Sequence, residues 1–277
     1  MKLRRNFLPS NVGDWSSFLF IVVIIPVFFW FELFIVLPDF YDYSSIWYWI
    51  HFVIGSFIMK NITSNLLAVM FIDTSIFSIS IPMDKCINWQ FCDTCQLPIP
   101  PRCWHCNICN RCILKRDHHC TFSGCCVGHF NHRFFIMFLS YFFVGCCYAL
   151  YFNLFFILSR VDFDYHSIFQ IVFPMMLILL GIDKALNHCL VIMLVLNIVG
   201  CTITGILLHF HLKLIYKGTV SYEYTKDNTR YDLGLKKNII HSLGTRWYLT
   251  WLSPFVDSPL IFDGADWSVD VLKTKAT

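Results

Sequence analysis

The sequence contains few charged residues. Asp, Glu, Lys and Arg make up 14% of its 277 residues, whereas hydrophobic residues make up 57%. Soluble globular domains carry about 25% charged residues, so this composition excludes an ordinary soluble domain and is typical of a membrane protein. The net charge of +3 is too small to indicate a nucleic-acid-binding surface, and we expect no nucleic-acid partner.

Long stretches with almost no charge predict the membrane-spanning helices, since about 20 apolar residues cross a bilayer. No small-residue cleavage site follows the first run, so we expect it to remain as a helix and not to be removed as a signal peptide. A shorter run, Ile168–Ile182, contains Pro174 and Gly181, and the sequence leaves open whether it crosses. We therefore predict an all-α polytopic membrane protein. Its four transmembrane helices are expected at Phe18–Leu37, Ile46–Ile72, Phe134–Ser159 and His188–Leu212.

The distribution of Lys and Arg predicts how the chain is oriented. Lys2, Arg4 and Arg5 precede the first run, and basic residues recur after the second and fourth runs, whereas residues 38–45 contain none. Because cytosolic loops carry an excess of Lys and Arg, we expect both ends and the segment between the second and third helices to be cytosolic. The predicted parts are 1–72 (N-terminus and first transmembrane hairpin), 73–133 (cytosolic cysteine-rich domain), 134–212 (second transmembrane hairpin) and 213–277 (cytosolic C-terminal segment).

The cysteine-rich segment is the most distinctive part of the chain. Nine of the fourteen cysteines lie between Cys92 and Cys126. Histidine has no role in a disulfide framework, so the histidines interleaved with these cysteines favour zinc binding in a reducing compartment. Pro98, Pro100 and Pro101 exclude a long helix here. We expect loops and short hairpins held together by metal.

Eight residues of this segment have the types and spacing of zinc ligands. A structural zinc site uses four sulfur or nitrogen ligands, so eight are enough for two closed sites, each with three cysteines and one histidine. Spacing alone leaves open whether the two sites are sequential or interleaved. The eight candidates are Cys92, Cys95, His105, Cys106, Cys109, Cys112, His119 and Cys126.

Cys120 is left over once these ligands are assigned, and it follows Asp117, His118 and His119 directly. An imidazole can remove the proton of a thiol, and a carboxylate can fix the tautomer of that imidazole, so His118 and Asp117 are candidates to activate Cys120. The alternative is that Cys120 is a ninth ligand or a spare thiol. Its position 14 residues before the third apolar run favours a nucleophile at the membrane surface. We predict acyl transfer through a cysteine thioester.

The segment from Cys92 to Phe135 resembles the DHHC-type protein S-acyltransferases, or palmitoyltransferases. The shared pattern is C-x-x-C, nine residues, H-C-x-x-C-x-x-C, four residues, D-H-H-C, five residues, C, four residues, N, three residues, F, and it includes Asn131. The resemblance implies a four-helix membrane enzyme that takes an acyl group from acyl-coenzyme A onto Cys120 and passes it to a substrate cysteine. It also implies His118 as the base and Asp117 as its orienting acid.

The same resemblance implies that the two structural zinc sites interleave. One ion would be held by Cys92, Cys95, His105 and Cys112, and the other by Cys106, Cys109, His119 and Cys126.

The chain departs from the family pattern at three places. Thr121-Phe122 replaces Pro-Trp after the nucleophile, and Phe122 keeps an aromatic surface that would contact the thioester of acyl-coenzyme A. Val220-Ser221-Tyr222-Glu223 replaces Thr-Thr-x-Glu and keeps one hydroxyl and the acid, and Asp73-Thr74-Ser75 stands for Asp-Pro-Gly. Asn238 matches an asparagine of the family's C-terminal segment.

The expected partners are acyl-coenzyme A (palmitoyl-coenzyme A), the lipid bilayer and substrate proteins with membrane-proximal cysteines. We expect a multi-pass membrane protein of the endoplasmic reticulum or Golgi, with its active site facing the cytosol. The alternatives are a catalytically weak or inactive zinc-bearing membrane adaptor and a membrane-anchored ubiquitin-type ligase with a zinc domain. The intact Asp117, His118 and Cys120 argue against the adaptor, whereas the extra His118-His119-Cys120 and the short segment before Phe134 argue against the ligase.

Overall fold

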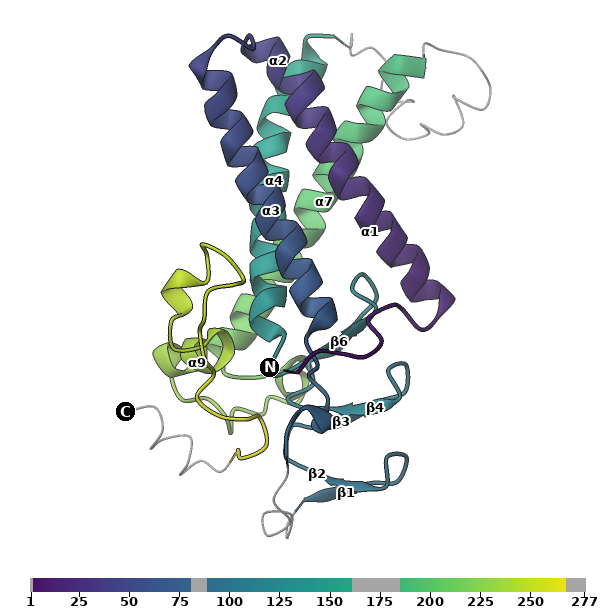
Figure 1. Cartoon of the computed structure of the whole chain (residues 1–277), viewed down its shortest axis with the longest axis vertical. Coiled ribbons are helices and arrows are strands. Elements are labelled where there is room, and N and C mark those ends of the chain that lie inside the picture. Colours follow the sequence, from purple (N-terminus) through teal and green to yellow (C-terminus); the bar gives the residue numbers. More distant parts are fainter. Residues whose placement is uncertain (1, 81–88, 161–184, 268–277) are drawn as a thin grey trace. The chain divides into compact units, whose positions relative to one another are not determined.

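The computed structural model describes residues 2–80, 89–160 and 185–267, with the side chains of the last range described from residue 189 (Figure 1). The predicted segment Ile168–Ile182 lies outside the described residues. The chain forms two compact units. The cysteine-rich unit comprises Met1–Ile21, Asn61–Phe138 and His209–Thr277, and the helical unit comprises Val22–Lys60 and Leu139–Leu208.

Four helices of the described ranges are long and apolar enough to cross a membrane, which confirms that the four predicted runs form helices. The first starts at Val12 instead of Phe18 because Asn11 caps it: the Asp14 amide donates to Asn11 Oδ1 at 2.8 Å. The helices are α1 (Val12–Phe31), which continues through the π-helical segment η1 (Glu32–Val36) into α2 (Leu37–Phe40), then α3 (Ile46–Phe71), α4 (His132–Leu158) and α7 (Ala185–Tyr216).

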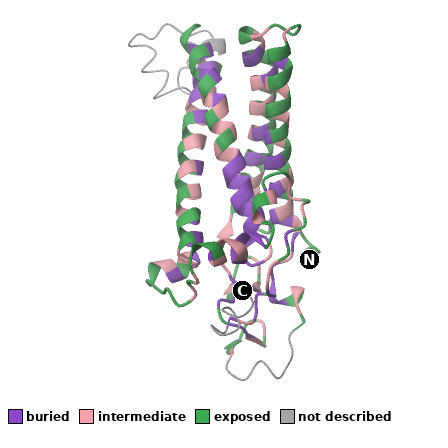
Figure 2. Cartoon of the chain, turned by 90° about the vertical axis from the view of Figure 1, so that its left-hand side faces the viewer, coloured by how far each residue is buried: buried purple, intermediate pink, exposed green. Residues whose placement is uncertain are grey.

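Large apolar residues remain exposed along these helices, whose ribbons have green, exposed stretches in Figure 2. Trp30, Val53 and Ile206 are exposed by 55%, 64% and 64%. In a soluble protein such rows would favour aggregation, whereas in a bilayer they face lipid chains. The exposure pattern therefore agrees with helices surrounded by lipid.

The helical unit has its own apolar core and partly buried polar contacts between its helices. Phe31 of α1 meets Phe156 of α4 edge to face at 6.1 Å. Within the same unit, the Asn153 amide donates to the Glu32 carboxyl, and the His51 ring is hydrogen-bonded to the Tyr148 hydroxyl. Polar side chains within membrane helices normally find such partners, because lipid offers none.

Strands occur in the cysteine-rich unit, so the all-α prediction is too coarse for this part. Its described residues include three short antiparallel hairpins, as expected from the proline pattern. These hairpins are β1 (Gln90–Cys92) with β2 (Leu97–Ile99), β3 (Trp104–Cys106) with β4 (Arg111–Ile113), and β5 (His118–Cys120) with β6 (Cys125–Val127).

The chain after α7 packs within the same unit as the hairpins. It forms α8 (Ser221–Thr225), α9 (Leu235–Leu243) and the 3-10 turn η4 (Trp247–Leu249), and a further 3-10 turn η2 (Ile76–Ser78) follows α3. Asn238 is 2% exposed; its side-chain amide donates to the Tyr216 carbonyl at 3.0 Å, and its oxygen accepts from the Leu233 amide at 3.1 Å. This one side chain therefore ties the end of α7 to the start of α9.

Candidate active site and metal-binding clusters

The hairpins are three copies of one turn. Cys92, Cys106 and Cys120 follow one another at intervals of 14 residues, and each ends the first strand of its hairpin. In the strand registers, each of these cysteines pairs with the first residue of the returning strand. Four residues after each of them comes a left-handed residue, with φ of 52° at Gln96, 48° at Asn110 and 59° at Gly124.

The copies differ at the fourth position of the turn. The first two turns have a second cysteine there, Cys95 and Cys109, whereas the third has Ser123. The Ser123 hydroxyl donates to the Cys120 carbonyl at 3.3 Å. The third hairpin therefore keeps the shape of the other two turns and has a cysteine at the first position of the turn but none at the fourth.

The eight predicted ligands lie in two clusters of four, and the clusters have the interleaved composition that the family resemblance implies. Within each cluster the candidate ligand atoms lie within 4.8 Å of one another. The described cysteines form no disulfide. The first cluster contains Cys92, Cys95, His105 and Cys112, and the second contains Cys106, Cys109, His119 and Cys126.

The distances between the ligand atoms fit tetrahedral zinc. With Zn–S bonds of about 2.3 Å, sulfurs at the corners of a tetrahedron lie about 3.8 Å apart. The Cys95 and Cys112 sulfurs are 3.6 Å apart, and those of Cys109 and Cys126 are 3.8 Å apart. His119 Nδ1 lies 3.3 to 3.8 Å from the three sulfurs of its cluster. Both clusters can hold a zinc ion by donor type and by spacing.

The three remaining predicted site residues also lie together. His118 Nδ1 is 2.6 Å from Asp117 Oδ2, so the Nδ1–H donates to the carboxylate and Nε2 is left for Cys120. The Asp117 carboxylate also accepts from Ser221, from its amide at 2.7 Å and its hydroxyl at 3.0 Å. The Asp117 side chain is 3% exposed, whereas that of His118 is 30% exposed. A fixed carboxylate thus orients an accessible imidazole beside a thiol.

These contacts shift the pKa of each group. Burial disfavours charge on all three, but the hydrogen bonds and charges among them outweigh it. The pKa of Asp117 falls well below its usual range through its bond to His118, and the pKa of His118 rises to about 9 through Asp117 and Cys120. The interaction with His118 lowers the pKa of the Cys120 thiol. The geometry therefore favours an imidazolium–thiolate pair.

Aromatic rings hold the imidazole of His118 in place. Phe135 meets it edge to face at 5.1 Å, and His211 of α7 lies 5.3 Å from it. His211 Nδ1 is also 3.7 Å from Asp117 Oδ2. Asn131, the motif residue directly before α4, supports the third hairpin. Its side-chain amide donates to the carbonyls of Val69 at 3.1 Å and Cys126 at 3.0 Å.

A buried ion pair joins the hairpins to the segment after α7. Arg102 donates two hydrogen bonds to the Glu223 carboxylate, at 2.7 and 2.6 Å, and the two side chains are 3% and 7% exposed. The Arg102 guanidinium also lies 4.4 Å from the ring centres of Tyr231 and Trp267. Because Ser221 and Glu223 share α8, this ion pair also positions Ser221 against Asp117.

Glu223→Gln is expected to destabilise the protein by about 3–5 kcal/mol, since it leaves the Arg102 charge buried without its partner. The midpoint of thermal unfolding in detergent measures this effect. Asp39→Asn is the matched control, because Asp39 pairs with Arg160 in the same two-bonded way but at 35% and 40% exposure. Exposed pairs contribute about 0–1 kcal/mol. Equal shifts in the two variants would contradict the structural role of the buried pair.

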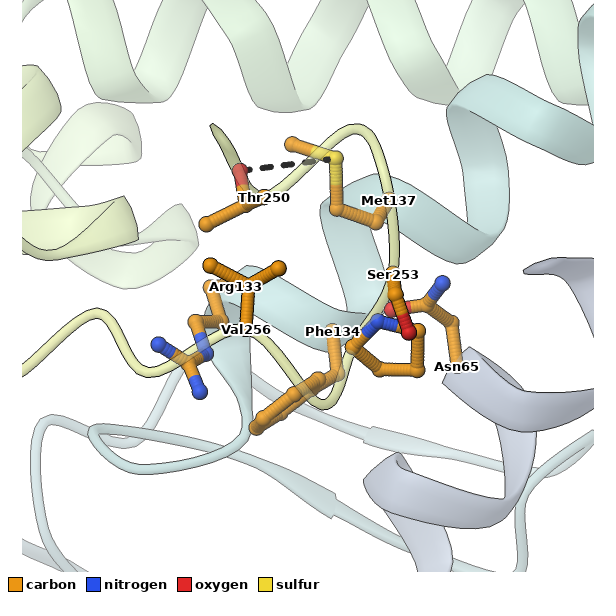
Figure 3. Close-up of a pocket in the computed structure, with 8 residues that line it drawn as sticks. Asn65, Arg133, Phe134, Met137, Thr250, Ser253 and Val256 are labelled. Carbon is orange, nitrogen blue, oxygen red and sulfur yellow. Dashed lines mark hydrogen bonds between the residues drawn. The ribbon is translucent and has the colours of Figure 1, made fainter. Parts of the chain in front are cut away.

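A small pocket lies elsewhere in the cysteine-rich unit, and Figure 3 shows side chains of α3, α4 and the C-terminal segment around it. The space between these side chains is about 160 Å³ and includes open solvent, and the Thr250 hydroxyl donates to the Met137 sulfur at 3.9 Å. Asp117, His118 and Cys120 do not line this pocket, so it is not the site of chemistry.

Sequence reasoning missed the contacts that come from distant parts of the chain. The sequence around His211 does not predict its contact with Asp117, and the sequence around Arg102 does not predict its ion pair with Glu223. The sequence shows Ser221 only as a hydroxyl retained from the family pattern and does not predict its hydrogen bonds to Asp117. The 14-residue repeat, in contrast, can be read from the sequence and would have predicted that Cys120 occupies a metal-binding type of turn.

Comparisons with known proteins show which family the chain resembles. The family model described as DHHC palmitoyltransferase matches residues 85–228. The chain is 31% identical to Probable palmitoyltransferase ZDHHC24 of Mus musculus over 179 residues, which are 64% of this chain and 63% of the mouse protein. The match to this relative therefore spans slightly less than two thirds of its length.

Two further relatives support the same assignment. Probable palmitoyltransferase ZDHHC24 of Danio rerio is 32% identical over 233 residues, covering 82% of this chain and 78% of the relative. Protein S-acyltransferase 8 of Arabidopsis thaliana is 46% identical over 70 residues, covering 23% of this chain and 17% of the relative. The resemblance predicted from the cysteine and histidine spacing is thus confirmed, and the chain belongs to the DHHC palmitoyltransferase family.

Proposed function

We propose that the protein is a protein S-acyltransferase that moves a palmitoyl-type acyl group from acyl-coenzyme A to Cys120 and then to cysteines of substrate proteins. The observation that carries this proposal is the 2.6 Å bond between Asp117 and His118, which leaves His118 Nε2 for Cys120. This arrangement is that of an activated nucleophile, with a base oriented by a third group. The relatives named as palmitoyltransferases support the reaction class.

In the first half-reaction, His118 takes the proton of the Cys120 thiol. The thiolate attacks the thioester carbonyl of acyl-coenzyme A, so a carbon–sulfur bond to Cys120 forms and the bond to the coenzyme A sulfur breaks. The coenzyme A thiolate then takes this proton from the His118 imidazolium and leaves as the free thiol. Asp117 stabilises that imidazolium, because it accepts the Nδ1–H in both protonation states.

In the second half-reaction the same groups act on the substrate protein. His118 takes the proton of the substrate thiol, and the substrate thiolate attacks the acyl-Cys120 carbonyl. The bond to Cys120 breaks, and Cys120 recovers its proton from His118. One thioester is exchanged for another at each step, so no external energy source is needed.

The role proposed for zinc is structural. Each ion supplies a cross-link among four side chains, and the three hairpins are too short to be stable without one. His119 and Cys126 lie opposite each other in the strand register, one residue from Cys120 and Cys125. The second cluster thereby holds the hairpin on which Cys120 lies.

The proposed setting is a membrane with the cysteine-rich unit on its cytosolic side, in the endoplasmic reticulum or Golgi. The segment 73–133 would be the cytosolic zinc domain, between the transmembrane hairpins of 1–72 and 134–212, with 213–277 also cytosolic. Phe122 is 38% exposed in the turn after Cys120 and is available to contact acyl-coenzyme A. Substrate cysteines near the membrane surface would then reach the acyl group.

Incubation of the purified protein with labelled palmitoyl-coenzyme A tests the proposal. We expect a hydroxylamine-sensitive label that peptide mass spectrometry maps to Cys120. Cys189→Ser is the matched control, because Cys189 is an exposed cysteine outside the clusters and its loss should leave the label unchanged. Absence of label on Cys120 in a protein that binds zinc would favour the adaptor function instead.

A further inference from the structure

The residues before α1 and those of its first turn are an integral part of the cysteine-rich unit. Leu3 forms an antiparallel bridge with Ile72, and the Arg4 amide donates to the Phe71 carbonyl at 2.7 Å. Phe7 meets Phe71 edge to face at 4.9 Å. This N-terminal segment, residues 2–14, is therefore held against the end of α3 by backbone and ring contacts.

The same segment contacts the turns of the second and third hairpins. The Ser10 hydroxyl donates to the Ile108 carbonyl at 3.3 Å. A Cβ atom placed on Gly124 would lie 2.8 Å from Pro9, so the third turn approaches the segment as closely as glycine allows. The N-terminal segment thus contacts the hairpin of Cys120 although it lies far from the cysteine-rich segment in the sequence.

Asp14 lies at the point where this segment meets the second metal-binding cluster. Its Oδ2 atom is 2.9 Å from His119 Nε2, and the two side chains are 2% and 6% exposed. Asn11 holds the carboxylate, since its side-chain amide donates to Asp14 Oδ2 at 2.8 Å. The buried Asp14 carboxylate, which Asn11 holds in place, therefore accepts a hydrogen bond from the ring nitrogen of His119 that does not face the sulfurs.

The ordinary explanation of an acid at this position is stabilisation of the helix N-terminus. That explanation accounts for an exposed Asp14 and does not require contact with an imidazole. His119 directs Nδ1 to the sulfurs, so its Nε2 carries the proton and needs an acceptor. Histidines that bind metals usually donate this proton to a carboxylate or carbonyl, which fixes the tautomer and strengthens the ligand. Among the residues that the structure describes, no carboxylate pairs with His105 of the first cluster.

We propose that Asp14 is a positioning residue of the second metal cluster. It accepts the Nε2–H of His119, keeps Nδ1 free for the metal, and so couples the N-terminal segment to the strand that contains both His119 and Cys120. The proposal rests on the zinc binding proposed above, and it adds that one of the two ions depends on a residue outside the cysteine-rich segment.

Zinc release from the full-length protein in detergent tests this proposal. A chelating dye added in excess reports how fast each of two zinc equivalents leaves the wild type, Asp14→Asn and Asp14→Ala. We expect Asp14→Ala to speed the loss of one equivalent by about 10–100-fold and to leave the other unchanged. Asp14→Asn should have a smaller effect, because its amide oxygen can still accept the Nε2–H. Ser10→Ala, which removes another contact of the same segment, should release zinc like the wild type.

The absorption spectrum of the cobalt-substituted protein provides a second readout. The bands of one cobalt ion should change in Asp14→Ala and return towards the wild-type form in Asp14→Asn. Unchanged release and spectra in Asp14→Ala would overturn the proposal, as would equal acceleration of both equivalents, which indicates general destabilisation. A wild-type protein without two zinc equivalents would instead overturn the zinc assignment itself, whatever the outcome for acyl transfer.

Discussion

Asp117→Asn is expected to slow the acylation of Cys120 by about 10⁴-fold, the loss seen when the aspartate of a serine-protease triad is replaced in the same way. The asparagine keeps the size of the side chain but removes its charge, so the His118 imidazolium is no longer stabilised. The neutral amide also permits the wrong tautomer of His118, with its proton on Nε2 facing Cys120. Rapid-mixing measurements of label transfer from palmitoyl-coenzyme A give the rate.

Two further variants provide the background rate and a smaller expected effect for comparison with Asp117→Asn. Cys120→Ser removes the nucleophilic sulfur and sets the background of the measurement. Ser221→Ala removes one hydroxyl donor to Asp117, but the Ser221 amide still donates at 2.7 Å, so its effect should be much smaller than that of Asp117→Asn. An Asp117→Asn protein that acylates within a few-fold of the wild-type rate would contradict the role of Asp117.

Cys126→Ala is expected to remove one zinc ion and to reduce the yield of folded protein severely. Apparent binding free energies of structural zinc reach about 10–16 kcal/mol in zinc-finger peptides, and they contribute directly to folding. Loss of one of four ligands should therefore unfold the third hairpin and the turn of Cys120. Zinc content by atomic emission and the elution profile in detergent measure the two effects.

Cys125→Ala is the control, because Cys125 is the adjacent residue on β6 and is equally buried, at 2% exposure. Its sulfur faces the Val69 carbonyl at 3.5 Å and is not in either cluster. We expect this variant to keep both zinc ions and most of its folded yield. Two zinc ions in purified Cys126→Ala would show that the assignment of ligands is wrong.

The sequence predicts the membrane helices well because a bilayer imposes a strong local requirement. A run of about 20 apolar residues has few alternatives, and all four predicted runs form helices. Their ends are less predictable. The start at Val12 depends on the cap by Asn11, and the end at Tyr216 extends past Leu212 because amphipathic residues continue the helix beyond the apolar run.

The clustering of the eight candidate metal ligands could be predicted for a similar reason, since zinc requires a fixed set of ligands with short spacings. The contacts between distant residues could not. Arg102 and Glu223 are 121 residues apart, and Asp14 and His119 are 105 residues apart. Each of these side chains has an ordinary local explanation, as a basic loop residue or a helix-terminal acid. Only the tertiary structure shows that it is buried against a partner.

The repeated turn adds a further cause, after the interaction with His118, for the lowered pKa of the Cys120 thiol. In a metal-binding turn the backbone amides point at the first cysteine: the Cys109 amide donates to the Cys106 sulfur at 3.5 Å. The same amide donor, from Ser123, lowers the pKa of the Cys120 thiol. A turn whose amides stabilise a metal-bound thiolate can therefore also stabilise the thiolate of a cysteine that binds no metal. The proposed nucleophile would use backbone dipoles that the neighbouring turns direct at candidate metal ligands.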